Sequence, residues 1–188
     1  AMEGPGPGEE ARSALDRVIA PDVDPGELAT RVEGNNVFAL DLYRIVREDQ
    51  ENVFYSPYSI ALTLAMAYAG ARGETAQQMA AALHYKLSQE RLHPSFSALS
   101  QRLASRDIEP ESGESETEAT GRPFRLVVAN AIWGQSGYSF RQAYLDVLAR
   151  NYGTGMRLVD FAEAPEEARR MLNDWVADRT AGRVEDLV

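Results

Sequence analysis

The sequence predicts an α+β fold in which helices are layered on a β-sheet. Residues 60–69 are almost entirely apolar, and a helix that is apolar on all faces lies at the centre of a domain. Residues 124–132 have the pattern of a strand with apolar side chains on both faces, which is typical of a strand covered on both sides. Five or six helical segments accompany this strand, so we expect them to cover the sheet.

Composition limits the classes of protein to which the chain can belong. Of its 188 residues 44% are hydrophobic, which is enough to bury a core. No apolar run approaches the roughly 18 residues of a membrane-spanning helix. The formal net charge of −10 repels phosphates and anionic lipids, so we expect neither nucleic acid nor membrane as a partner. No signal peptide is visible, and we leave the compartment open while slightly favouring secretion.

Patterns that would indicate an enzyme or a metal site are lacking. The absence of cysteine excludes disulfides, thiolate metal sites and cysteine nucleophiles. The two histidines, His84 and His93, have no carboxylate at a metal-ligand spacing, so we expect surface or packing roles. Residues 134–137 suggest a nucleophile elbow, but Tyr138 stands where that motif needs glycine. We therefore expect no enzyme, no catalytic residue, no metal and no cofactor.

The N-terminal residues differ in composition from the rest of the chain. Residues 1–34 are rich in Gly, Pro and Glu and contain one weak helical patch around residues 11–19, so we predict a flexible extension. We place the start of the ordered region at Asn35. An amphipathic helix is then predicted by three apolar side chains at helical spacing, namely Phe38, Leu42 and Ile45.

Local signals predict where the next elements begin. Residues 53–55 are apolar and predict a short strand. Ser56 then fits the N-cap of the apolar helix, and Pro57 fits its first position, where a missing N–H has no consequence. Thr75 and Gln78 have the spacing of a capping box, which predicts the start of the following helix.

The second half of the chain contains a predicted loop, two helices and a strand. Pro94 is predicted to open a fourth helix, and the six acids in residues 105–122 predict a solvated loop. Helices are predicted over residues 140–152 and 165–182, each ending at a glycine. Residues 156–161 are predicted to form a strand between these two helices.

Three sequence blocks resemble the serpin family. Residues 52–62, NVFYSPYSIAL, continued by Met66 and GARGET at 70–75, resemble the serpin segment that leads from a short strand into the buried helix B. Residues 130–135, NAIWGQ, are similar to the strand that enters helix E. The end of strand 1 of sheet A and helix F are matched by four further pieces, at residues 160–161, 165–168, 173–176 and 180–187. The blocks follow the family's order, and the resemblance covers about residues 35–188.

The resemblance implies the serpin fold, in which helices are layered on β-sheet A. Residues 35–188 would be the N-terminal half of the serpin domain, with its helical part and the first strands of sheet A, preceded by the extension 1–34. The resemblance also implies that four residues belong to the polar shutter beneath the centre of sheet A, namely Ser56, Pro57, Ser59 and Asn173. A plain N-cap for Ser56 and a small helix residue for Ser59 remain alternative interpretations.

The function implied by the resemblance is inhibition of a serine protease by a suicide, loop-insertion mechanism. The expected partners of the full-length protein are a serine or cysteine protease and the remaining C-terminal half. Because the sequence stops at Val188, where the central strand should begin, the reactive bond is not in this chain, which would supply scaffold only. Two alternatives stay open, a non-inhibitory serpin used for carriage, chaperoning or storage, and a stand-alone helical interaction module.

Overall fold

The computed structural model describes residues 6, 8–48, 52–106 and 126–188. Most of the predicted acidic loop 105–122 lies outside these residues. The helical elements are α1 (Pro25–Val46), α2 (Pro57–Tyr68), α3 (Gly73–Ala82), α4 (Gln89–Ala104), α5 (Gln142–Val147), the π-helical turn η1 (Leu148–Tyr152) and α6 (Pro165–Arg179). The strands are β1 (Glu10–Ala11), β2 (Trp133–Gln135) and β3 (Met156–Val159). None of the described helices is both long enough and apolar enough to cross a bilayer.

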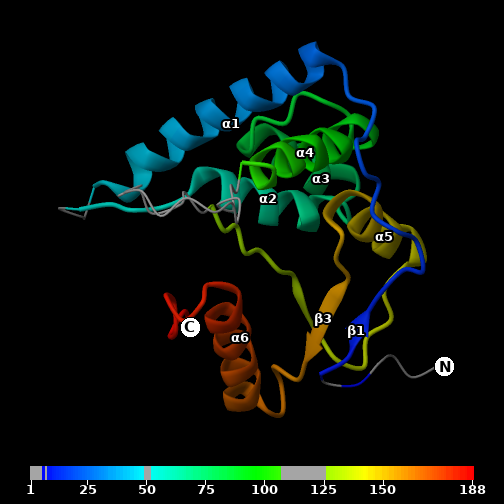
Figure 1. Ribbon diagram of the computed structural model, residues 1–188, viewed down its shortest axis with the longest axis vertical. Helices are drawn as coiled ribbons and strands as arrows, with labels where there is room; N and C mark the ends of the chain where they lie inside the picture. Colours follow the sequence, from blue (N-terminus) through cyan, green and yellow to red (C-terminus); the bar gives the residue numbers. More distant parts are fainter. Residues whose placement is uncertain (1–5, 7, 49–51, 107–125) are drawn as a thin grey trace, which may run out of the picture.

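The described strands form one sheet in the order β1-β3-β2, with β3 in the centre. Strand β2 runs parallel to β3 and places Gly134 opposite Leu158. The α5–η1 helix connects these two strands, as a parallel pair requires. Strand β1 comes from the other end of the chain and pairs antiparallel with β3, with Glu10 opposite Arg157. Figure 1 shows α1–α4 gathered in one half of the molecule, with α6, β1 and β3 in the other half.

Two clusters of buried side chains hold these elements together, and α2 contributes to both. The larger cluster joins α1, α2 and α4 and the segment after α3, and its buried members include Phe38, Ala65, Tyr85 and Phe96. The smaller cluster joins β1, α2, α5, η1 and β3 through Ala11, Met66, Leu145, Leu148, Met156 and Leu158. Burial of α2 from both sides confirms the central helix that its all-apolar sequence predicted.

The N-terminal residues carry more secondary structure than the sequence predicted. Helix α1 begins at Pro25 and not at Asn35, because Asp24 and Glu27 form a capping box. The Asp24 carboxylate accepts the Gly26 N–H at 2.7 Å, and the Glu27 carboxylate accepts the Asp24 N–H at 3.1 Å. The helical patch predicted around residues 11–19 is also wrong, since that range follows β1 without a helix. The domain boundary at residue 34 stays a prediction.

Two predicted strands do not form where they were expected. Residues 53–55 form no strand, and Phe54 is fully exposed. The described part of the segment 124–132, residues 126–132, is irregular, and the strand begins only at Trp133. A strand needs a neighbour for its N–H and C=O groups, and within the described residues the parallel pairing with β3 covers only residues 133–135. The apolar pattern of residues 124–132 predicted a strand, but it carried no information on whether a neighbouring strand would be present.

Helix starts after α2 also differ from the prediction. Helix α3 begins at Gly73 without the capping box expected from Thr75 and Gln78. Helix α4 begins at Gln89, so Pro94 lies inside the helix instead of opening it. The first turns of α4 are helical because their side chains enter the core, where Leu92 is 1% exposed. On α1, Ile45 points to solvent with 69% of its surface exposed, although its spacing had placed it on the buried face.

Other local predictions are confirmed. Ser56 is the N-cap of α2 and Pro57 is its first residue. The helix predicted over residues 140–152 forms as α5 and η1, and it ends at Gly153 in the left-handed region with φ of 67°. Helix α6 begins at Pro165 as predicted. Gly182, predicted to end the last helix, has φ of 70° and follows α6 by a short turn.

A buried glycine in α1 provides a test of the packing between α1 and the segment after α3. A methyl group at Gly34 would lie 2.4 Å from the His84 carbonyl oxygen. Gly→Ala in an exposed helix stabilises by about 1 kcal/mol, but here we expect Gly34→Ala to lower the free energy of unfolding by at least about 1 kcal/mol. Urea denaturation followed by circular dichroism measures the change.

The matched control is Gly70→Ala. The atoms nearest to a methyl group at Gly70 lie 3.5 Å away, which is ordinary van der Waals contact. This variant should change the urea midpoint little. A Gly34→Ala protein as stable as the control would show that α1 does not pack against His84 as described.

Candidate functional site

Three of the four predicted shutter residues lie together at the start of α2. The Ser56 hydroxyl oxygen accepts the Ser59 N–H at 3.3 Å, which is the expected N-cap bond. The same hydroxyl donates to the Ser59 hydroxyl oxygen at 3.1 Å. Pro57 lies between them at the first helical position. The first turn of α2 therefore presents two hydroxyl groups, and that of Ser56 belongs to an exposed residue.

The fourth predicted residue, Asn173, lies on α6 and is 7% exposed. Its Oδ1 accepts the N–H groups of Leu187 and Val188 at 3.0 and 3.1 Å. Its Nδ2 donates to the Val188 carbonyl oxygen at 3.0 Å. The side-chain amide of Asn173 therefore bonds to backbone N–H and C=O groups of the last two residues. Its donor and its acceptor, both buried, have partners.

The structure does not bring the two groups together by a hydrogen bond. Within the described residues, Ser56 and Ser59 bond to each other, and Asn173 bonds to the residues that follow α6. A different polar contact links α2 to the segment before β2, in which the Thr63 hydroxyl donates to Asn130 Oδ1 at 3.3 Å.

Helix α6 lies against the sheet through a cluster that the sequence reasoning missed. Trp133 of β2 and Trp175 of α6 meet edge to face with their ring centroids 6.2 Å apart. The guanidinium of Arg157, on β3, lies 5.7 Å from the Trp133 centroid and 5.5 Å from that of Trp175. Arg179 lies 5.7 Å from the Trp175 centroid on α6 itself. Cation–π contacts of this kind stabilise the packing of α6 against the sheet. The alternation of apolar and charged side chains along β3 was the only sequence pattern that could have pointed to Arg157.

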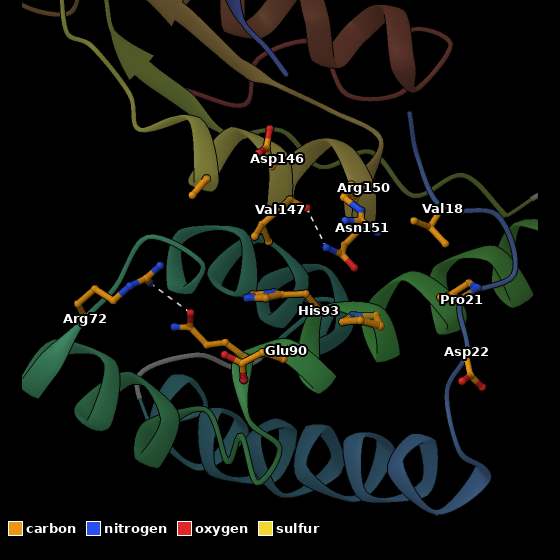
Figure 2. Close-up of a pocket in the computed structure, with 13 residues that line it drawn as sticks. Val18, Pro21, Asp22, Arg72, Glu90, His93, Asp146, Val147, Arg150 and Asn151 are labelled. Atoms are coloured by element: carbon orange, nitrogen blue, oxygen red, sulfur yellow. Dashed lines mark hydrogen bonds between the residues drawn. The ribbon is translucent and has the colours of Figure 1, made fainter. Parts of the chain in front are cut away.

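The pocket drawn in Figure 2 has a volume of about 510 Å³ and lies between the start of α4, the α5–η1 helix and the N-terminal segment. Two of its charged side chains, those of Arg72 and Asp146, have partners within the described residues. Arg72 donates to the Ala69 and Ala71 carbonyl oxygens at 2.8 and 2.7 Å and to Gln89 at 3.2 Å. Asp146 accepts from the Ser13 hydroxyl at 2.6 Å. These contacts tie segments of the chain to one another and form no catalytic set.

His93 stands at the edge of this pocket and is only 3% exposed. Its Nδ1 lies 2.7 Å from the Tyr152 hydroxyl, and the two rings meet edge to face. Burial lowers the pKa of His93 to about 4, an effect that Glu90 opposes and Arg72 increases. The ring is therefore neutral at neutral pH and packs between helices, which is one of the roles that its sequence context predicted.

Comparison with known proteins identifies the family. The family model described as Serpin (serine protease inhibitor) matches residues 33–188. The chain belongs to the serpin family, as its sequence blocks predicted. This is a family of protease inhibitors and not of enzymes.

Two relatives and one solved structure show how far the similarity extends. The chain is 40% identical over 157 residues to an uncharacterised serpin-like protein of Thermococcus kodakarensis, which covers 84% of this chain and 34% of that protein. It is 34% identical over 156 residues to the leukocyte elastase inhibitor of Bos taurus, covering 82% of this chain and 37% of that protein. The chain thus spans little more than a third of the length of these relatives.

The native-state crystal structure of the thermophilic serpin tengpin has the same fold. It superposes with a TM-score of 0.72 and 22% identity, over 97% of this chain and 42% of that one. The predicted α+β class and the partial serpin architecture are thereby confirmed.

The buried histidine makes the stability of the chain depend on pH. Because the folded pKa of about 4 lies below the ordinary value of 6.5, the unfolded chain binds more protons between these values. The free energy of unfolding should therefore fall as the pH decreases from 6.5 to 4, with His93 contributing up to roughly 3 kcal/mol. Urea denaturation across this range should show a steeper pH dependence for the wild type than for His93→Phe, and equal slopes would contradict the assignment.

The contact between Asn173 and the C-terminal residues can be tested by hydrogen exchange. Asn173→Ala removes three hydrogen bonds, so the amides of Leu187 and Val188 should exchange about tenfold faster or more. The neighbouring Asp174 is exposed and makes no side-chain hydrogen bond within the described residues, so Asp174→Ala is the control. Unchanged exchange in the Asn173 variant would show that other contacts hold these residues.

Proposed function

We propose that this chain is the N-terminal half of a serpin that inhibits a serine protease by a suicide, loop-insertion mechanism. The observation that carries the proposal is the family match, together with relatives whose names identify them as protease inhibitors. This chain would supply the scaffold and not the reactive bond. In such a mechanism, cleavage of an exposed loop lets the loop enter the sheet as a new strand, and the hydrogen bonds and burial gained drive the change.

The geometry of the sheet supports a scaffold role. Both edges of β3 are bonded, to β1 on one side and to β2 on the other. The outer edge of β2 has no neighbour within the described residues, so a further strand can pair there. Asn173 holds the backbone of Leu187 and Val188, which lie several residues after the end of α6. We infer that the C-terminal half, as a partner, continues the sheet from these residues.

A shutter role for Ser56, Pro57, Ser59 and Asn173 is part of the same proposal. The two serine hydroxyl groups stand at the N-terminus of the buried α2, where they can change partners without disturbing the apolar core. Asn173 bonds to backbone atoms by both its donor and its acceptor, which suits a residue that orders the start of the next strand. Both groups would then control how readily the sheet opens.

Exposed apolar side chains argue against a stand-alone module. Phe54 is fully exposed, and Val127 and Val128 are 48% and 40% exposed. These residues flank α2 and β2 in the sequence and would be covered by further chain in a complete serpin domain. No observation on the described residues favours a carrier or storage serpin over an inhibitor.

The test uses the complete protein, extended through its reactive loop. Incubated with a panel of serine and cysteine proteases, it should form a covalent one-to-one complex that survives denaturing electrophoresis. A protease with a blocked nucleophile is the control and should form none. After cleavage within the loop, the melting temperature should rise because the sheet has gained a strand. Cleavage with neither a complex nor a rise in melting temperature would establish a non-inhibitory serpin and contradict the proposal.

A further inference from the structure

Two adjoining cavities, separate from the pocket in Figure 2, lie along the side chain of Arg17. Their volumes are about 290 and 310 Å³, and they share Arg17, Ser100 of α4 and Val128 as walls. The N-terminal segment brings Arg17 to this position, and its side chain packs closely on Gly153, where an added methyl group would lie 2.8 Å from Arg17 Cδ. Glycine at residue 153 thus leaves room for the arginine.

The polar atoms around these cavities are mostly hydrogen-bond donors. Arg17 Nε and Asn130 Nδ2 are buried and have no hydrogen-bond partner among the described residues. The amide of Asn130 is oriented by the Thr63 hydroxyl, which donates to its Oδ1, so that Nδ2 remains as the free donor. Burial raises the pKa of Tyr58, whose hydroxyl therefore stays protonated beside Arg17. Buried donors without acceptors are costly, and an acceptor at this place would satisfy them.

The charge at this place is positive in a chain that is acidic as a whole. Two guanidinium groups, those of Arg17 and Arg179, line the smaller cavity. No described carboxylate lines either cavity, and none lies within 4 Å of Arg17. Against a net charge of −10, these two side chains make the place locally positive.

The remaining walls are apolar. Leu62 and Met66 of α2 line the smaller cavity, and Leu103, Leu126 and Val127 line the larger one. An inorganic anion would satisfy the donors but leave these walls in contact with water. A carboxylate attached to a hydrocarbon body satisfies both, since the guanidinium fork matches a carboxylate and the hydrocarbon covers the apolar surface.

We propose that the paired cavities bind a small organic carboxylate with an apolar body, such as a medium-chain fatty acid. Its carboxylate accepts hydrogen bonds from Arg17 and Asn130, and its chain lies along Leu62, Met66 and Val128. The combined space is of the size at which proteins bind small molecules. The site is independent of protease inhibition, because it uses no residue proposed for the shutter.

Octanoate is the probe, titrated by isothermal calorimetry into the complete protein, in which the C-terminal half is present and the cavities have their full surroundings. We expect saturable binding at one site. Octanol and inorganic phosphate should each bind at least tenfold more weakly, because octanol lacks the carboxylate and phosphate lacks the hydrocarbon chain. Arg17→Gln should weaken octanoate binding tenfold or more. The control is Arg12→Gln, since Arg12 belongs to the same N-terminal segment but is exposed and lines neither cavity.

A second variant keeps the result interpretable if Arg17→Gln disturbs folding. Ser100→Leu leaves every donor in place but fills the wall that both cavities share, so it should also weaken octanoate binding, with circular dichroism unchanged. Absence of saturable octanoate binding would overturn the proposal and indicate that a carboxylate of the chain itself, or water, satisfies the donors. Equal binding of octanol, or unchanged affinity in either cavity variant, would overturn it as well.

Discussion

The apolar helix α2 has to be buried from both sides, and this requirement determines how the other elements pack. One side of this helix packs Ala61, Leu62 and Ala65 against α1 and α4, and the other side packs Met66 against α5 and β3. An apolar helix of this kind gains stability only when it is covered all round, at roughly 25 cal/mol for each Å² removed from water. Helices α1 and α4 on one side, and the sheet with its crossover helix on the other, therefore have to meet at α2.

The sheet is held together by segments that are distant in the sequence. Strand β3 bonds to β1 near the N-terminus and to β2, while Trp175 of α6 packs edge to face against Trp133 with Arg157 near both rings. Asn173 then holds the residues that follow α6. These contacts position a helix across a sheet whose outer edge at β2 remains open within the described part of the chain. Such an arrangement suits a scaffold that other strands complete.

The N-terminal segment shows how polar contacts extend this scaffold. Ser13 bonds to Asp146, and the N–H of Val18 bonds to the Arg150 carbonyl oxygen at 2.9 Å. The same segment places Arg17 against Gly153. The Gly-, Pro- and Glu-rich composition predicted a flexible extension. It could not predict these contacts, because each depends on a partner more than a hundred residues away in the sequence.

Features that depend on local chemistry could be predicted from the amino-acid sequence alone. Ser56 and Pro57 started α2, Gly153 ended the helix before β3, and an all-apolar run marked the central helix, because caps, left-handed turns and complete burial leave direct traces in residue type. The three sequence blocks that resemble serpins indicated the fold class. The role of the shutter residues stays a prediction. Three other features became visible only in the folded chain: residues 126–132 form no strand, β1 pairs with β3, and Arg17 lines a cavity with Asn130. Strand pairing and cavity walls need partners far away in the chain, and a local pattern cannot specify which partner arrives.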